Sequence, residues 1–193
     1  MKRWLGKNYR KKSDESLMEL LKKGDKSSFE ELYHRYSKRL LFYFYKMLWQ
    51  DEPKSQDFLQ EIFIKIIEKP DSFQKGKKFS TWIFSVAHNM CKNEYRRKIN
   101  RNEIALETDH EKLWYDSEWQ FDFEQKLFEK QFNLALEKLN ENQKAVFIFR
   151  YKENLSIQEI AEILDCSEGT VKSRLYYASR KLAELLKNFS PVN

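Results

Sequence analysis

The sequence predicts an all-α fold: two small helical domains joined by an acidic linker, with a helix-turn-helix in the second domain. The chain has only four glycines and three prolines in 193 residues, a composition that favours long helices over a turn-rich β fold. Apolar residues recur at helical spacing from Ser13 to about Lys98, and again from about Phe128 to Leu186. Residues 102–124 lack this periodicity and carry eight acidic residues against one lysine, which predicts the linker.

Two helices are expected first in the N-terminal domain. Leu17, Leu20 and Leu21 mark a short helix, which Gly24 closes. A long second helix is indicated by seven apolar residues at helical spacing, which are Phe29, Leu32, Tyr33, Tyr36, Leu40, Phe44 and Met47.

Two further helices complete this domain. The third follows Pro53, a residue that is well tolerated at a helix start, and ends before Pro70. The fourth runs from Phe79 to Arg97 and is expected to turn four apolar residues inward, which are Ile83, Val86, Ala87 and Met90.

The second domain contains two short helices joined by a tight turn. Ser156 and Glu159 form a capping box, so the first helix is expected to begin at Ile157. Residues 165–167 break the pattern, and Ser167 suits the N-cap of the second helix. The second helix is expected to turn Val171, Leu175, Ala178 and Leu182 inward. The pair suits a helix-turn-helix, whose second helix lies in the DNA major groove; an ordinary helical hairpin with a solvated basic face fits the same pattern.

Charge points to a polyanionic partner. The net charge is +6, and residues 1–12 are uniformly basic, which predicts a flexible tail. Residues 92–101 add five further basic side chains against Glu94 alone. This cluster ends the aromatic segment that begins at Phe79, and aromatic rings beside cations suit single-stranded nucleic acid. The alternative is that Phe79 and Trp82 are core residues and the cluster is a solvated helix end.

Several function classes find no support. No apolar run reaches the length of a membrane span, so we expect a cytoplasmic protein without direct membrane insertion. Cys91 and Cys166 are far apart in the chain, each within a helical pattern, and are expected to be buried free thiols. No Gly-rich phosphate loop or nucleophile motif occurs. We therefore expect no enzyme activity, no cofactor and no small-molecule substrate.

Two pairs of side chains have the spacing of partial metal sites. His88 and Cys91 stand one helical turn apart, but no further ligands follow at matching spacing. Asp57 and Glu61 lie in a polar strip on the third helix and would be the carboxylates of a metal-dependent nuclease, yet no third ligand accompanies them. A solvated or partner-docking face is the favoured interpretation of this strip, and no metal is expected.

Four segments together resemble one family, the bacterial RNA polymerase sigma factors of the extracytoplasmic-function (ECF) group. Phe29–Tyr36 resembles the opening helix of the family's first conserved domain, and Gln56–Phe63 is similar to its polymerase-docking helix. Phe79–Arg97, with Phe-Ser-Thr-Trp at its start, resembles the promoter-melting helix. Leu139–Leu186 resembles the promoter-recognition domain. The resemblance implies a basic tail at 1–12, region 2 at 13–99, a linker at 100–127 and region 4 at 128–189.

The resemblance also implies roles for particular residues. The chain would dock on core RNA polymerase, on the clamp helices of the largest subunit, through Asp57, Gln60 and Glu61. The fourth helix and the loop before it would capture the unstacked non-template strand of the −10 element. Phe79 and Trp82 would shape the melting surface, and Asn89, Lys92, Asn93 and Arg96 would contact bases or phosphates. The helix-turn-helix would read the −35 element of promoter DNA through Lys172, Ser173, Arg174, Tyr176, Tyr177 and Arg180.

Further partners are implied in the same way. Region 4 would meet the flap of the second polymerase subunit, and an anti-sigma factor would hold both domains together. The acidic linker would thread through the polymerase cleft, or else serve as a solvated spacer. Family members often carry a basic residue where this chain has Tyr177, so aromatic contacts are expected to carry more of the −35 reading. The competing hypothesis is a stand-alone helix-turn-helix regulator that binds duplex DNA without polymerase.

Overall fold

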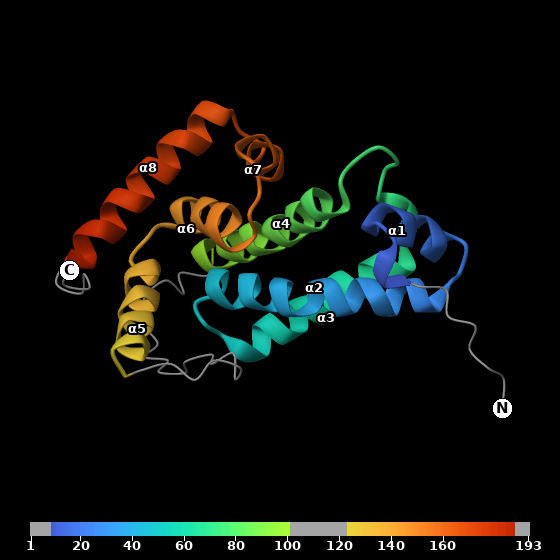
Figure 1. Ribbon diagram of the computed structural model, residues 1–193, viewed down its shortest axis with the longest axis horizontal. Coiled ribbons are helices and arrows are strands. Elements are labelled where there is room, and N and C mark those ends of the chain that lie inside the picture. The colour runs from blue at the N-terminus through green and yellow to red at the C-terminus, as the bar shows by residue number, and fades with distance from the viewer. Residues whose placement is uncertain (1–8, 101–122, 188–193) are drawn as a thin grey trace. The chain divides into compact units, whose positions relative to one another are not determined.

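The computed structural model describes residues 9–100 and 123–187, with side chains from residue 128 onward in the second range. These residues are helical wherever they are regular, and no strand occurs among them (Figure 1). The chain divides into two compact units, Met1–Arg101 and Asn102–Asn193. The all-α expectation is therefore confirmed, whereas residues 101–122, which hold nearly all of the predicted linker, lie outside the described residues.

Helices of the first unit begin where short polar side chains cap them. Ser13, Asp25 and Asp51 each accept a hydrogen bond from a backbone N–H in the first turn of the helix that follows. The resulting elements are η1 (Tyr9–Lys11), α1 (Asp14–Lys22), α2 (Lys26–Met47), α3 (Glu52–Glu68), η2 (Pro70–Ser72) and α4 (Phe79–Asn100). All four predicted helices are present, and α4 extends past its expected end at Arg97 into the predicted linker.

Helix α2 is the centre of the first unit, and α1, α3 and α4 all pack against it. The core is rich in aromatic side chains, and those that are fully buried include Tyr36, Tyr43, Phe44, Phe73, Phe79 and Phe84. Three residues of α4 that were expected to face inward are buried, which are Ile83, Ala87 and Met90. The fourth, Val86, is only half-buried, and Phe84 is buried instead. The reason is that α4 packs against several helices and so buries a broader face than one stripe.

The N-terminal boundary of this unit differs from the prediction of a tail at residues 1–12. The guanidinium of Arg35 donates hydrogen bonds to the backbone oxygens of Tyr9, Arg10 and Lys12 at 3.1, 3.1 and 2.9 Å. The hydroxyl of Tyr9 also donates to the carboxylate of Asp25 at 2.9 Å. Residues 9–12 are therefore part of the folded unit, because a side chain distant in sequence satisfies their backbone acceptors.

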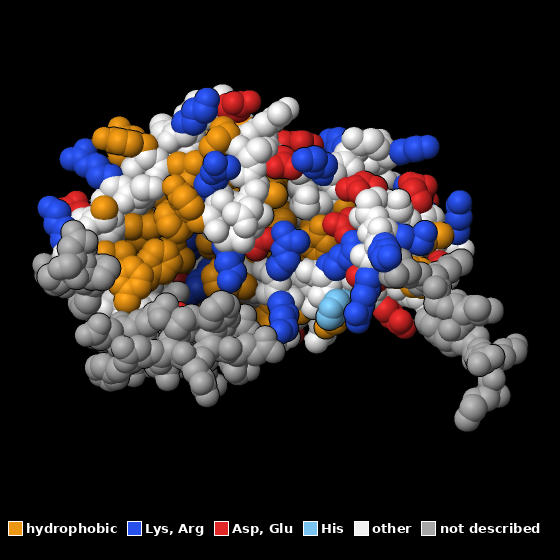
Figure 2. Space-filling model, in the orientation of Figure 1, with side chains coloured by type: hydrophobic (Ala, Val, Ile, Leu, Met, Phe, Trp, Pro, Cys, Tyr) orange, Lys and Arg blue, Asp and Glu red, His pale blue; other side chains and the backbone are white. Residues whose placement is uncertain are grey.

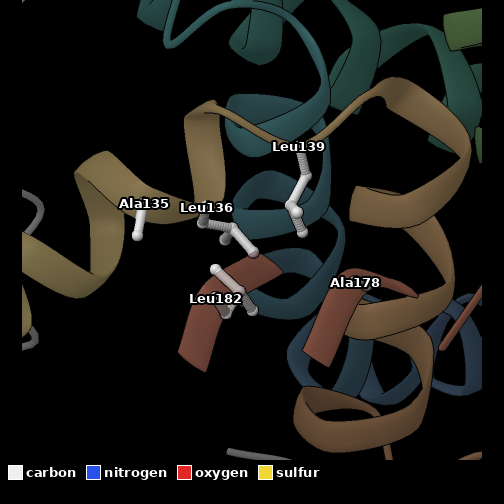
Figure 3. Close-up of a cluster of buried hydrophobic side chains, with 5 residues drawn as sticks. All are labelled: Ala135, Leu136, Leu139, Ala178 and Leu182. Atoms are coloured by element: carbon white, nitrogen blue, oxygen red, sulfur yellow. The ribbon is translucent and has the colours of Figure 1, made fainter. Parts of the chain in front are cut away.

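The second unit contains five helical elements, which are α5 (Phe123–Glu137), α6 (Glu141–Phe147), a π-helical turn η4 (Ile148–Lys152), α7 (Ile157–Leu164) and α8 (Glu168–Leu185). One part of its core joins α5 to α8 through Ala135, Leu136, Leu139, Ala178 and Leu182 (Figure 3). Helix α5 begins at Phe123, within the range 100–127 that was predicted as the linker.

The helix-turn-helix has the predicted local structure. The capping box of Ser156 and Glu159 is present with both hydrogen bonds, and α7 begins at Ile157 as expected. Asp165 then adopts a left-handed conformation, with φ of 49°, and ends α7. The hydroxyl of Ser167 accepts a hydrogen bond from the N–H of Thr170 and caps α8. The two helices are thus separated by a three-residue turn.

Both cysteines are free thiols, but only Cys91 is buried as predicted, whereas Cys166 is half-buried in the turn of the helix-turn-helix. Cys91 is buried in the first unit, and burial raises the pKa of its thiol well above the usual range. Within the part of the chain that the structure describes, no helix combines the length and apolar character needed to cross a membrane.

Candidate nucleic-acid interface

Helix α4 has one face in the core and one polar face in solvent. The exposed positions include the four that the family resemblance implied, which are Asn89, Lys92, Asn93 and Arg96. Their spacing of three, four and seven residues places them on one side of the helix. On the opposite side, Glu94 is buried and forms an ion pair with Lys54 of α3, which ties the helix to the unit. A rigid helix thus carries two amides and two cations to the surface.

Trp82 lies at the start of this surface, half-buried on an aromatic platform. Its ring centroid is 5.4 Å from that of Phe73 and 5.6 Å from that of Phe79. The ring of Phe79 is fully buried and also contacts Tyr36 at 5.1 Å. Phe79, which was expected to shape the −10 surface together with Trp82, thus has its side chain in the core, where it packs against the indole of Trp82. Sequence reasoning missed Phe73, whose isolated position before a loop gives no periodic signal.

A basic loop, residues 74–78, connects η2 to α4. All five residues, Gln74 to Lys78, are exposed, and three of them are lysines. Gly76 adopts a φ of +90°, a backbone conformation that residues other than glycine rarely adopt. The loop therefore makes a tight turn and presents positive charge beside the start of α4, where phosphates would be attracted.

Helix α3 presents a different surface. Asp57, Gln60 and Glu61 are all exposed, as their predicted role in docking requires. Glu61 forms an ion pair with Lys65 at 2.7 Å, and both side chains are about half exposed. The strip continues into two exposed apolar residues, Ile64 and Ile67, at 50% and 52% exposure.

The apolar end of this strip adjoins an aromatic cluster. Tyr33 of α2 is 45% exposed, and its ring contacts those of Phe29 and Phe63. The sequence contained a signal for these apolar residues, because residues 62–67 include five apolar side chains, more than one helix face can bury. An acidic strip with apolar neighbours is typical of a protein-binding face.

Helix α8 displays most of the residues predicted to read DNA. Lys172, Ser173, Tyr176, Tyr177 and Arg180 are exposed on the side opposite the buried Val171, Ala178 and Leu182. Tyr176 and Tyr177 are 62% and 56% exposed, and their ring centroids are 5.4 Å apart. Figure 2 shows hydrophobic side chains, a class that includes tyrosine, gathered along α8. The helix thus offers both cations and aromatic rings to a ligand.

Arg174 differs from its neighbours. It is half-buried, and its Nη1 lies 3.7 Å from the Sγ of Cys166 in the turn of the helix-turn-helix. Its guanidinium therefore braces the turn against α8. Further along α8, Tyr177 and Arg180 line an open hollow of about 360 Å³, whose other lining residues are Gln143, Lys181 and Glu184.

The described residues bring no three of His, Cys, Asp and Glu together in a way that would hold a metal ion. His88 instead shares a hydrogen bond with the hydroxyl of Tyr43 at 3.0 Å. Asp57 and Glu61 lie on an open helix face.

Two family models match the chain, one in each unit. The model of sigma-70 region 2 matches residues 32–101, and the model of sigma-70 region 4 matches residues 129–182. The first range contains α3 and α4 with their exposed strips, and the second contains the helix-turn-helix.

Curated relatives match over nearly their whole length. The ECF RNA polymerase sigma-E factor of Haemophilus influenzae is 30% identical over 183 residues, covering 86% of this chain and 91% of that protein. The ECF RNA polymerase sigma factor SigW of Bacillus subtilis is 28% identical over 176 residues, covering 87% of this chain and 94% of that protein.

Two solved structures share the fold. The sigma factor RpoE of Bartonella quintana, solved in complex with the anti-sigma factor NepR, gives a TM-score of 0.69 at 23% identity and covers 82% of this chain and 96% of its own. CnrH, solved in complex with the cytosolic domain of CnrY, gives a TM-score of 0.67 at 21% identity and covers 92% and 99%. Together with the two matched regions and the relatives, they lead to one conclusion: this chain belongs to the ECF sigma factors, which direct RNA polymerase to initiate transcription at specific promoters.

Proposed function

We propose that the chain carries out promoter-specific initiation through three separate surfaces, each built from the residues described above. The observation that carries this proposal is the division of labour within the first unit. The exposed strip of α3 is acidic and apolar, whereas the exposed strip of α4 is amide-bearing and basic. One surface suits a protein and the other suits a polyanion.

The strip of α3 is the proposed docking face for core RNA polymerase. Asp57, Gln60 and Glu61 would meet the clamp helices of the largest subunit, with Ile64 and Ile67 adding apolar contact. Exposed carboxylates steer association with a basic partner, and apolar neighbours slow its dissociation once water is excluded.

The strip of α4 is the proposed site for the non-template strand of the −10 element. Trp82 offers an aromatic face to an unpaired base, since stacking on a ring does not depend on base pairing. Lys92 and Arg96 would neutralise phosphates, and Asn89 and Asn93 carry amides that both donate and accept hydrogen bonds to base edges.

Helix α8 is the proposed −35 reader, with region 4 docked on the flap of the second polymerase subunit. Lys172 and Arg180 would contact phosphates, and Ser173 can donate to or accept from a base edge. The rings of Tyr176 and Tyr177 would lie against thymine methyl groups. Arg174 would act indirectly, by bracing the turn.

We also propose that the protein is held inactive by an anti-sigma factor, that it works in the cytoplasm and that it has no catalytic activity of its own. The solved structures support the first point, since RpoE is bound to the anti-sigma factor NepR and CnrH is bound to the cytosolic domain of CnrY.

Separate loss of the two first-unit activities tests the proposal. Asp57→Lys combined with Glu61→Lys should abolish binding to core polymerase. Lys92→Ala combined with Arg96→Ala should leave that binding unchanged and abolish promoter opening, measured by permanganate reactivity of unpaired thymines. Glu30→Lys, an exposed change on α2, is the control. If the α4 variant lost polymerase binding, or if the α3 variant kept it, the assignment of the two faces would be wrong.

A further inference from the structure

Helix α1 holds both ends of the loop that leads into α4. The ammonium of Lys22 donates to the backbone oxygen of Phe73 at 2.9 Å, where the loop begins. The carboxylate of Glu15 accepts from the backbone N–H of Phe79 at 3.0 Å, where the loop ends. Glu15 and Lys22 are seven residues apart, about two helical turns, so both lie on one face of α1. Figure 1 shows α1 beside this connection.

Glu15 does for α4 what a local N-cap does for other helices. The first N–H groups of a helix have no acceptor within it, and a carboxylate near them also interacts favourably with the helix dipole. Here the carboxylate comes from another helix, 64 residues earlier in the chain. Burial acts to raise the pKa of Glu15, but hydrogen bonds led by that from Phe79 outweigh it and leave the pKa lowered.

Helix α1, which binds both ends of the loop through Lys22 and Glu15, is itself fixed to the core. Asp14, next to Glu15, contacts the guanidinium of Arg35 at 2.6 Å and accepts a hydrogen bond from the hydroxyl of Tyr36. Both partners belong to α2, the central helix of the unit. These contacts with α2 hold Glu15 in a fixed position relative to the core.

Phe73 and Phe79, the two residues that α1 binds, also form the aromatic platform that contacts Trp82. The rings of Phe73 and Phe79 are buried, with centroids 5.6 Å apart, and both contact the indole. Between them, residues 74–78 are exposed and turn at Gly76. Backbone hydrogen bonds and ring contacts thus fix the ends of a short loop whose middle carries only exposed polar and charged side chains.

We propose that Glu15 and Lys22 are positioning residues that preorganise the 74–78 loop to capture the unpaired −10 strand. The inference rests on the proposed function of α4 and adds two residues that touch no nucleic acid. Ordering a flexible loop on binding costs conformational entropy, and a loop that is already ordered avoids most of that cost. The two hydrogen bonds therefore increase affinity for the strand without adding a contact to it.

A purely structural role predicts a different outcome. If the hydrogen bonds of Glu15 and Lys22 only stabilised the first unit, their loss would weaken polymerase binding and strand capture together. Charge excludes an electrostatic explanation, because Glu15→Ala removes a negative charge and would strengthen nucleic-acid binding by long-range attraction alone. Weaker binding of the strand in this variant, with polymerase binding unchanged, therefore points to the loop.

The experiment uses holoenzyme assembled from the full chain and core RNA polymerase. The probes are a single-stranded oligonucleotide that carries the non-template −10 sequence and, for comparison, a −35 duplex. Glu15→Ala and Lys22→Met should each weaken binding of the oligonucleotide by about tenfold, with core-polymerase and −35 affinities unchanged. Glu15→Gln and Lys22→Arg, which keep an acceptor and a donor, should bind within about threefold of the parent. Lys23→Met, an exposed neighbour, matches the charge change of Lys22→Met and should have little effect.

Two results would overturn the inference. One is a parent-like affinity of Glu15→Ala and Lys22→Met for the oligonucleotide, or an equal loss in the Gln and Arg variants. The other is a parallel loss of oligonucleotide, polymerase and −35 binding, which is the structural outcome. Failure of the underlying function is recognised separately, because Lys92→Ala with Arg96→Ala would then leave oligonucleotide binding unchanged.

Discussion

The guanidinium of Arg35 and the carboxylate of Asp14 meet at 2.6 Å, each side chain 23% exposed, and this contact joins α2 to α1. The same guanidinium bonds Glu31 at 2.8 Å and the backbone of the segment before α1. The side chain of Arg35 thus holds both the segment of residues 9–12 and helix α1 against α2.

Arg35→Ala should destabilise the first unit by about 2–3 kcal/mol, because it removes the cation that pairs with the Asp14 and Glu31 carboxylates and the donor to several backbone oxygens. Hydrogen exchange of the α1 and α2 amides, with and without urea, measures the loss of stability in the first unit separately from the second. Lys38→Ala, an exposed change on the same helix, should change the stability by less than about 0.5 kcal/mol. Equal effects of the two substitutions would contradict the role given to Arg35.

Ser167→Ala should weaken the start of α8, because the hydroxyl of Ser167 satisfies the N–H of Thr170 at 3.1 Å. The expected cost is about 1 kcal/mol, seen as faster hydrogen exchange in the first turn of α8 and as weaker −35 binding. Ser167→Thr keeps the oxygen and should behave like the parent. Parent-like exchange in the alanine variant would show that the cap contributes nothing.

Gly169→Ala should stabilise the second unit and weaken −35 binding. Gly169 has no positive φ, and a methyl group there would meet only the Oγ of Ser167, at an ordinary 3.7 Å. Alanine is favoured over glycine in a helix by about 1 kcal/mol, so the fold alone does not call for glycine. A glycine in the first turn of a reading helix is explained by close approach of DNA. If Gly169→Ala raised the stability of the second unit but left −35 affinity unchanged, close approach of DNA would not explain the glycine.

Lys172→Ala should lower −35 affinity and reduce the slope of log affinity against log salt by about one unit, since each phosphate contact releases bound counterions. Lys172 lies 3.8 Å from Glu168, with both side chains more than half exposed, an ion pair that contributes little to stability. Titrations of a −35 duplex at several salt concentrations give the slope. Lys187→Ala, beyond the end of α8, is the control, and a slope unchanged from the parent in Lys172→Ala would exclude the phosphate contact.

The first unit should lose stability in acid partly through Glu15. Because its pKa is lowered on folding from an ordinary 4.5, the charged form stabilises the fold above that value, and this contribution is lost as pH falls through the lowered pKa. The stability difference between the parent and Glu15→Gln should therefore be present at neutral pH and shrink in acid. A difference that grows as pH falls would mean that the pKa is raised instead.

The sequence allowed the four α-helices of the first unit to be predicted, because apolar residues recur at helical spacing and Gly or Pro marks several of the helix ends. In the second unit, Ser156 and Ser167 predicted the first residues of α7 and α8, because their side chains accept hydrogen bonds from nearby backbone N–H groups. The polar strip of α3 was predicted from helical spacing, whereas the strip of α4 was implied by the family resemblance.

What the sequence could not show depends on contacts between distant segments. The role of Arg35 in holding residues 9–12, and that of Glu15 in capping α4, join residues 23 or more positions apart that share no periodic pattern. The sequence left open whether Phe79 lies in the core or at the surface, because an aromatic residue at a helix start gives the same pattern whether it faces solvent or, as here, packs on Tyr36.

Reconstituted transcription tests the central claim most directly. The purified chain is added to core RNA polymerase with a library of genomic fragments from the source organism, and run-off products are sequenced at their 5′ ends. We expect discrete start sites that require the chain, share −10 and −35 sequences, and disappear with Asp57→Lys plus Glu61→Lys. Absence of any chain-dependent start site, with polymerase active on a control promoter with its own sigma factor, would contradict the account.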